Sequence, residues 1–168
     1  MFDINNHGIA ELTIRKAEEG DSALLLELIR GLAVYERLEA EMTATVEGLR
    51  EAVFARREAE AIIAEYNGEA AGFALYFENF STFLGHKNLY LEDLFVWEHL
   101  RGLGIGKALL RAVARVAASR GSRRLDWCCL DWNEPSKAFY RSLGAREMSD
   151  WRVFRLEGEA LDTFAGKM

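Results

Sequence analysis

The chain has 168 residues; half are hydrophobic, 29% are charged and the net charge is −6. This length and composition are typical of a soluble protein with one full hydrophobic core, so we expect a single domain over residues 1–168. No apolar run reaches the roughly 18 residues of a membrane-spanning helix. An acidic chain is also a poor general binder of nucleic-acid phosphates. We therefore expect neither a membrane nor a nucleic acid as a partner.

The N-terminus and the cysteines indicate a reduced, cytoplasmic protein. The stretch MFDINNHGIAELTIRK lacks the basic and then apolar segments of a secretory signal. Cys128 and Cys129 are adjacent, and neighbouring side chains on a strand point to opposite faces, so we expect no disulfide between them. Two cysteines without spaced partners also make a poor metal site, and we expect no metal.

The first part of the chain predicts a strand, a helix and a second, shorter helix. ELTIRKA (11–17) alternates apolar and polar residues, as a half-buried strand does. Asp21 or Ser22 can cap a helix whose apolar residues fall on one face: Leu24, Leu25, Leu28, Ile29 and Leu32. A short helix is expected next, from Thr43 or Thr45 to Phe54.

A hairpin and a loop follow. Asn67-Gly68 joins two β-rich runs, and this dipeptide favours a type I′ turn. Residues 78–88 are expected to form a loop with exposed aromatic side chains.

LYLEDLFVW (89–97) then predicts a nearly continuous apolar strand that carries two acids, Glu92 and Asp93. A glycine-rich turn follows it, and a helix is expected over about 106–119.

The last part predicts a strand at RRLDWCCLDW (123–132) and a helix from Pro135 to Leu143, ended by Gly144. WRVFRLE (151–157) is expected to be a late strand, with a short helix after it. The whole order, β-α-α-β-β-β-α-β-α-β, predicts an α/β domain with a mixed sheet.

The glycine-rich turn RGLGIGKALL (101–110) is a candidate anion site. A strand, a turn and a helix N-terminus present free amides and a partial positive charge. The spacing fits neither the Walker phosphate loop nor the G-x-G-x-x-G dinucleotide loop. From the turn alone, a tight corner with no ligand remains an alternative.

The spacing that fits is R-x-x-G-x-G, from Arg101 to Gly106. With LYLEDLFVWEHLRGLGIGKALL and, further on, DWNEPSKAFYRSLGA, the chain resembles the GNAT N-acetyltransferases over about residues 10–156. Within that superfamily, LAVYERL, YLED, WNEPS, FYRSLGA and EGEALDTFAGK resemble the spermidine/spermine (diamine) and thialysine N-acetyltransferases.

This resemblance implies a fold and an activity. The fold is a mixed, mostly antiparallel sheet of six or seven strands, splayed between two central strands, with helices on both faces. The implied activity moves the acetyl group of acetyl-CoA directly to a primary amine of a small cationic substrate, such as a polyamine, a diamine or thialysine. A homodimer is also implied.

The resemblance further implies which residues contact coenzyme A. They lie in three stretches, the end of the acidic strand, the glycine turn and the start of the later helix: Leu94, Phe95, Val96; Arg101, Gly102, Leu103, Gly104, Ile105, Gly106, Lys107; and Asn133, Glu134, Pro135, Ser136.

Catalysis needs a proton acceptor for the amine, because a lysine-like ammonium with a pKa of about 10.4 arrives protonated at pH 7. Glu92 and Asp93 are candidates, and on a regular strand they face opposite ways unless a bulge intervenes. The resemblance selects Glu92 for deprotonation and Tyr140 as the proton donor to the coenzyme A thiolate. Without it, Glu92 could be a solvated acid and Tyr140 a core aromatic beside Phe139.

The candidate amine site contains Tyr35, Glu36, Glu92, Asp93, Asp126, Trp127 and Cys128. Tyr35 and Glu36 could equally be a helix-end tyrosine and a surface acid. Two other functions stay open from the sequence, acetylation of a protein or peptide and a non-catalytic regulator that binds acyl-CoA. Four acids in the candidate site favour a small charged amine instead, and the presence of both Glu92 and Tyr140 favours an enzyme.

Overall fold

The computed structural model describes residue 5 and residues 7–167. The chain folds into two compact units, one that ends at Cys128 and one that begins at Cys129.

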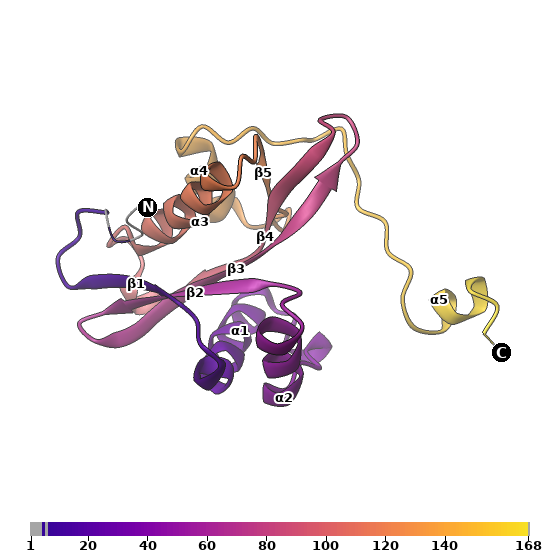
Figure 1. Cartoon of the computed structure of the whole chain (residues 1–168), viewed down its shortest axis with the longest axis horizontal. Coiled ribbons are helices and arrows are strands. Elements are labelled where there is room, and N and C mark those ends of the chain that lie inside the picture. Colours follow the sequence, from indigo (N-terminus) through magenta and orange to yellow (C-terminus); the bar gives the residue numbers. More distant parts are fainter. Residues whose placement is uncertain (1–4, 6, 168) are drawn as a thin grey trace. The chain divides into compact units, whose positions relative to one another are not determined.

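The first unit contains a mixed sheet with helices on both faces (Figure 1). Its described strands are β1 (Leu12–Lys16), β2 (Glu60–Tyr66), β3 (Glu69–Ser81), β4 (His86–Val96) and β5 (Leu125–Asp126). They lie in the order β1-β2-β3-β4-β5, and all neighbours are antiparallel except β4 and β5, which are parallel. The prediction of an α/β fold with a mixed, mostly antiparallel sheet is therefore confirmed.

The helices form layers on the two faces of this sheet. They are α1 (Ser22–Glu36), α2 (Val46–Leu49) with a π-helical continuation (Arg50–Ala55), and α3 (Ile105–Ser119), with short 3₁₀ turns at Glu19–Asp21, Glu39–Glu41 and Glu98–Leu100. Figure 1 shows α1 and α2 on one face and α3 on the other. Leu25 and Leu28 of α1 are fully buried and pack with Phe73, Leu75 and Phe95 of the sheet.

The predicted strand and helices of the first part of the chain are confirmed, although Asp21, the N-cap residue of α1, makes no cap hydrogen bond with its side chain. β1 and α1 lie where the sequence places them, and the side chain of Thr45 caps α2 by accepting a hydrogen bond from the amide of Gly48 at 3.0 Å. Asn67 and Gly68 have φ angles of 54° and 81°, as a type I′ turn requires.

The prediction of a loop over 78–88 is wrong. β3 continues to Ser81 and β4 begins at His86, so this stretch forms a hairpin arm with a short turn. Main-chain pairing continues through polar positions such as Asn79 opposite Asn88, which a hydrophobicity pattern does not detect. Phe83, in the turn, is 92% exposed, so the expected exposed aromatic is present.

The prediction of a strand over 123–132 is right only for Leu125–Asp126, and the described sheet has five strands rather than six or seven. β5 pairs with β4 only at Leu89 and Tyr90. Beyond these two positions, the described residues leave one edge of β4 without a neighbouring strand, as expected for a splayed sheet.

The second unit contains α4 (Glu134–Ser142) and α5 (Gly158–Phe164). Gly144, with a φ of 87°, follows α4 and donates its amide to the carbonyl of Arg141, as predicted for a helix stop. The predicted strand over 151–157 is wrong, because no described strand pairs with this segment and its backbone has no regular structure. Its apolar side chains are exposed, Phe154 by 93%.

Close contact between α1 and β4 depends on Gly31. A Cβ at this position would lie 2.6 Å from Cζ3 of Trp97 and 2.8 Å from Cε1 of Phe95. These distances are shorter than real Cβ contacts, so any larger residue would push α1 away from the end of β4.

We predict that Gly31→Ala lowers the free energy of unfolding. Overpacking costs about 1–3 kcal/mol. We expect this cost to be larger than the roughly 1 kcal/mol that alanine gains over glycine within a helix. Urea denaturation measures the change. Gly20→Ala is the matched control, because no atom lies within 4 Å of a Cβ there. Equal stability of the two variants would contradict the prediction.

Candidate active site

A β-bulge in β4 determines where the two acids of that strand point. Leu75 of β3 lies opposite Asp93, whereas the next residue, Tyr76, lies opposite Leu91, so Glu92 is an extra residue in β4. A bulge of this kind breaks the strict alternation of side chains. It is the irregularity that allows adjacent carboxylates to act on one site.

The carboxylates of Glu36, Glu92 and Asp93 form an electrostatically coupled cluster. Burial, and after it the negative charges of Glu92 and Glu36, raises the pKa of Asp93 to about 7. Burial also raises the pKa of Glu36, which lies in the last turn of α1. The cluster therefore joins the end of α1 to the bulge of β4 and presents a negative region to a cationic ligand.

Tyr90 extends this cluster toward β5. Its hydroxyl donates a hydrogen bond to Sγ of Cys128 at 3.0 Å, and its ring lies 5.3 Å from that of Phe77. Burial raises the pKa of Tyr90, and the hydrogen bond to Cys128 and the charges of Glu92 and Asp126 act in the same direction. Cys128 and Asp126 thus lie beside Tyr90, and Asp126 also pairs with Arg124 at 2.6 Å.

The glycine turn has the backbone geometry of an anion site. Gly102 and Gly104 have φ angles of 82° and 84°, a region that favours glycine. Gly104 is the N-cap of α3 and has no side chain to accept hydrogen bonds from the first amides of that helix. These amides include those of Gly106 and Lys107, and the partial positive charge of a helix N-terminus favours an anion.

Arg101 contacts both the end of β4 and α1. Its Nε donates to the carbonyl oxygen of Val96 at 3.1 Å, and its guanidinium carbon lies 4.3 Å from the centre of the Tyr35 ring. The side chain is therefore engaged with the end of β4 and with α1.

Five of the predicted residues lie in the second unit, and Trp127 lies in the first. Asn133 is buried, and its Oδ1 caps α4 by accepting a hydrogen bond from the amide of Ser136 at 3.2 Å. Glu134 forms an ion pair with Lys137 at 2.6 Å, and Pro135 occupies the first turn of the helix. Tyr140 lies on the same helix and is half-buried, with its ring 5.3 Å from that of Phe139.

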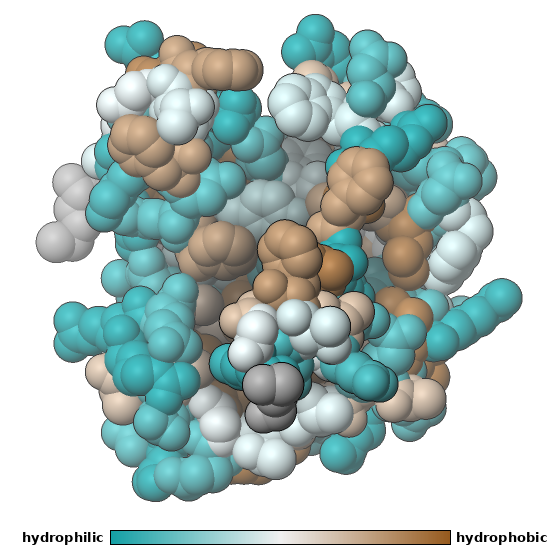
Figure 2. Space-filling view, turned by 90° about the vertical axis from the view of Figure 1, so that its right-hand side faces the viewer, coloured by the Kyte–Doolittle hydropathy of each residue, from teal (hydrophilic) through white to brown (hydrophobic). Residues whose placement is uncertain are grey.

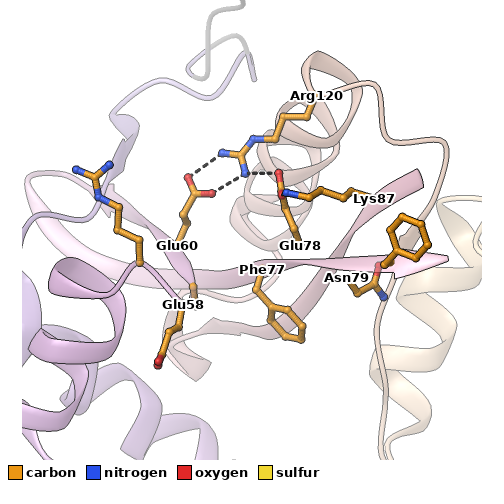
Figure 3. Close-up of a pocket in the computed structure, with 10 residues that line it drawn as sticks. Glu58, Glu60, Phe77, Glu78, Asn79, Lys87 and Arg120 are labelled. Atoms are coloured by element: carbon orange, nitrogen blue, oxygen red, sulfur yellow. Dashed lines mark hydrogen bonds and ion pairs between the residues drawn. The ribbon is translucent and has the colours of Figure 1, made fainter. Parts of the chain in front are cut away.

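A separate hollow of ≈ 490 Å³ lies between the start of β2 and the hairpin arm of β3 and β4 (Figure 3). Its acids are already paired: Glu60 binds Arg120 at 2.6 Å, and Glu78 binds Lys87 at 2.7 Å. Because these charges are neutralised, the hollow is a weaker candidate for binding an ammonium than the cluster at the bulge.

A strand with a bulge and two acids, a glycine turn and a helix N-terminus thus occur in sequence. The model of the acetyltransferase (GNAT) family matches residues 25–145. The chain belongs to the GNAT acetyltransferase family. Among curated members, the thialysine N-epsilon-acetyltransferase of Bos taurus is 38% identical over 95% of this chain and 100% of its own length. The enzyme of Sus scrofa is 37% identical over the same shares. These findings identify an N-acetyltransferase that acts on amines.

Solved structures support the fold. An integron cassette protein from the mobile metagenome of V. cholerae superposes with a TM-score of 0.78 at 27% identity, covering 92% of this chain and 98% of its own. An aminoglycoside acetyltransferase from a soil metagenome superposes with a TM-score of 0.74 at 20% identity, which shows the same fold only.

The described residues contain neither a membrane span nor a metal cluster. No described helix is both long and apolar enough to cross a bilayer. Within the same residues, no group of three or more histidine, cysteine or acidic side chains could hold a metal ion.

Sequence reasoning missed Tyr90 and the contact between Tyr35 and Arg101. Tyr90 precedes Glu92 by two residues and was not among the candidate site residues. The cation–π contact joins residues 66 positions apart in the sequence, and no local pattern predicts it.

We predict that Asp93→Asn stabilises the protein more at pH 8 than at pH 5. The folded chain holds the Asp93 proton up to a pKa of about 7, whereas the unfolded value is near 3.8. The folded state thus binds more protons between these values and loses stability as the pH rises through them. The amide removes this loss.

Thermal unfolding at both pH values measures the effect. We expect the gain in Tm of Asp93→Asn over the parent chain to be roughly 3 °C or more larger at pH 8. Asp150→Asn, at an exposed position, is the control and should show no such difference. An equal gain at both pH values would rule out the raised pKa.

Proposed function

We propose that the chain transfers the acetyl group of acetyl-CoA to a primary amine of a small cationic substrate, of the lysine-analogue or polyamine type. The observation that carries this proposal is the carboxylate cluster of Glu36, Glu92 and Asp93 at the bulge of β4, within an acetyltransferase fold. Relatives named for thialysine and, in Arabidopsis thaliana, for L-ornithine support an acceptor with a side-chain amine.

The residues of the first unit fit acetyl-CoA, which supplies the acetyl group as a thioester. The amides at the start of α3 and the positive φ angles of Gly102 and Gly104 suit a diphosphate. Lys107 and Arg111 are exposed on the first turns of α3 and add positive charge. Leu94, Phe95 and Val96 lie on the stretch of β4 that has no described strand at one edge, where an extended ligand can pair with the backbone.

The cluster at the bulge binds the ammonium and prepares it for reaction. Glu92, exposed at the bulge, assists removal of the proton, directly or through water. Asp93 has a pKa of about 7, which is close to the working pH and suits proton exchange beside Glu92. A backbone amide of β4 polarises the acetyl carbonyl. The hydroxyl of Tyr140 donates the proton that the departing sulfur needs.

We also propose a homodimer. Large apolar side chains are exposed along the second unit: Met148, Trp151, Val153, Phe154, Leu156, Leu161 and Phe164. Figure 2 shows hydrophobic side chains at the surface among hydrophilic ones. Monomeric soluble proteins rarely expose large apolar patches, so a second copy of the chain is a suitable cover.

A screen of amines with acetyl-CoA, measured by release of the free thiol, tests the proposed function. The panel contains thialysine, ornithine, lysine, spermidine, a short diamine and short peptides. We expect turnover of free amines and none of peptides. Turnover of peptides alone would indicate a peptide acetyltransferase, and tight binding of acetyl-CoA without any turnover would indicate a regulator.

We predict that Tyr140→Phe lowers kcat by about 10²- to 10⁴-fold, the usual contribution of general acid catalysis. The affinity for acetyl-CoA, measured by calorimetry, should change little, because the ring remains. Glu69→Gln, at an exposed position on β3, controls for surface changes. An unchanged kcat would remove Tyr140 as the proton donor.

A further inference from the structure

The C-terminal half of α1 lies against the end of β4 and the residues after it, through two positions that are one helical turn apart. At the first, Gly31 allows direct contact with Phe95 and Trp97. At the second, the ring of Tyr35 lies beneath the guanidinium of Arg101 at 4.3 Å. Residues i and i+4 lie on the same helix face, so one face of α1 contacts both the end of β4 and the residue that begins the glycine turn.

Arg101 is held at three points. Its backbone amide donates to the carbonyl of Glu98 at 3.1 Å, and its Nε donates to the carbonyl of Val96 at 3.1 Å. The face of the guanidinium stacks on Tyr35. A planar group can stack on a ring while it donates in its own plane, and a lysine ammonium cannot do both in this way.

These contacts join the two halves of the proposed site. Val96 is the last residue of β4, and Gly102, which follows Arg101, opens the turn proposed for the diphosphate. Tyr35 is adjacent to Glu36, whose charge contributes to the cluster proposed for the amine. The side chain of Arg101 therefore contacts Tyr35, next to the proposed amine site. The backbone of Arg101 begins the glycine turn proposed for the diphosphate.

We propose that Arg101 is a positioning residue, which couples the binding of the amine to the binding of coenzyme A by stacking on Tyr35. This inference rests on the proposed function, and it assigns the charge that meets the diphosphate to Lys107 and Arg111 rather than to Arg101. It follows that Tyr35, a residue of α1 beside the proposed amine site, contributes to the affinity for coenzyme A.

Calorimetric titration with coenzyme A alone tests whether Tyr35 contributes, through Arg101, to the affinity for coenzyme A. The variants are Tyr35→Leu, Tyr35→Phe, Arg101→Gln, Arg101→Lys and the double variant Tyr35→Leu/Arg101→Gln. We expect Tyr35→Leu to weaken binding about two- to fivefold, the range for an exposed cation–π contact. Tyr35→Phe keeps the ring face and should bind like the parent chain. Arg101→Lys should bind less tightly than the parent, because it keeps the charge but loses the geometry.

The double variant separates coupling from independent effects. If Arg101 acts through Tyr35, the double variant binds no more weakly than Arg101→Gln alone. In steady-state assays, Tyr35→Leu should raise the KM for the amine and leave kcat within about twofold. A general loss of folding would affect kcat as well, and circular dichroism with urea denaturation of each variant identifies it. If Tyr35→Leu does not fold, the proposal is tested by the other two variants: Arg101→Lys should bind coenzyme A less tightly than the parent chain, and Tyr35→Phe should bind it equally well.

Three results would overturn the proposal. They are additive losses in the double variant, unchanged or tighter binding by Tyr35→Leu, and equal weakening by Tyr35→Phe. Failure of the parent chain to bind coenzyme A would overturn both this inference and the proposed function. Binding by the parent chain with additive effects would overturn the coupling alone.

Discussion

Glu92 is an extra residue in β4, and the arrangement of charges in the first unit depends on this bulge. With regular alternation, Glu92 and Asp93 would lie on opposite faces of the sheet. With the bulge, the charge of Glu92 acts on both Asp93 and Tyr90, while Glu36 approaches from α1. The partly buried carboxylates of Glu36 and Asp93, with the charge of Glu92 nearby, carry an electrostatic cost, which a bound ammonium would relieve. The cost is therefore consistent with a site for a cation.

The proposed site also depends on the close approach of α1 to the end of β4. Gly31 permits this approach, and it brings Glu36 and Tyr35 to the strand that carries the acids. The same strand leads through Arg101 into the glycine turn and the first amides of α3. One continuous stretch of chain, from Glu92 to Lys107, thus contributes to both the proposed amine site and the proposed diphosphate site.

Sequence patterns were reliable where local chemistry decides the structure. The Asn67-Gly68 turn, the cap at Thr45 and the stop at Gly144 each depend on a residue and its immediate neighbours, and each prediction is confirmed. The hairpin arm over 78–88 and the length of β5 were predicted wrongly, because strand pairing there depends on main-chain partners distant in the sequence. The late strand over 151–157 failed for a related reason, since alternation cannot say whether a sheet edge is available.

By itself, the sequence determined the acetyltransferase family, the glycine turn and the identity of the acids, because these depend on residue types at fixed spacing. It also indicated that a bulge was needed for Glu92 and Asp93 to act together. Only the tertiary structure decided that the bulge exists, that burial and neighbouring charges raise the pKa of Asp93 to about 7, and that Arg101 contacts Tyr35. Register, burial and contacts between distant residues arise from packing, and packing is a property of the whole fold rather than of any local pattern.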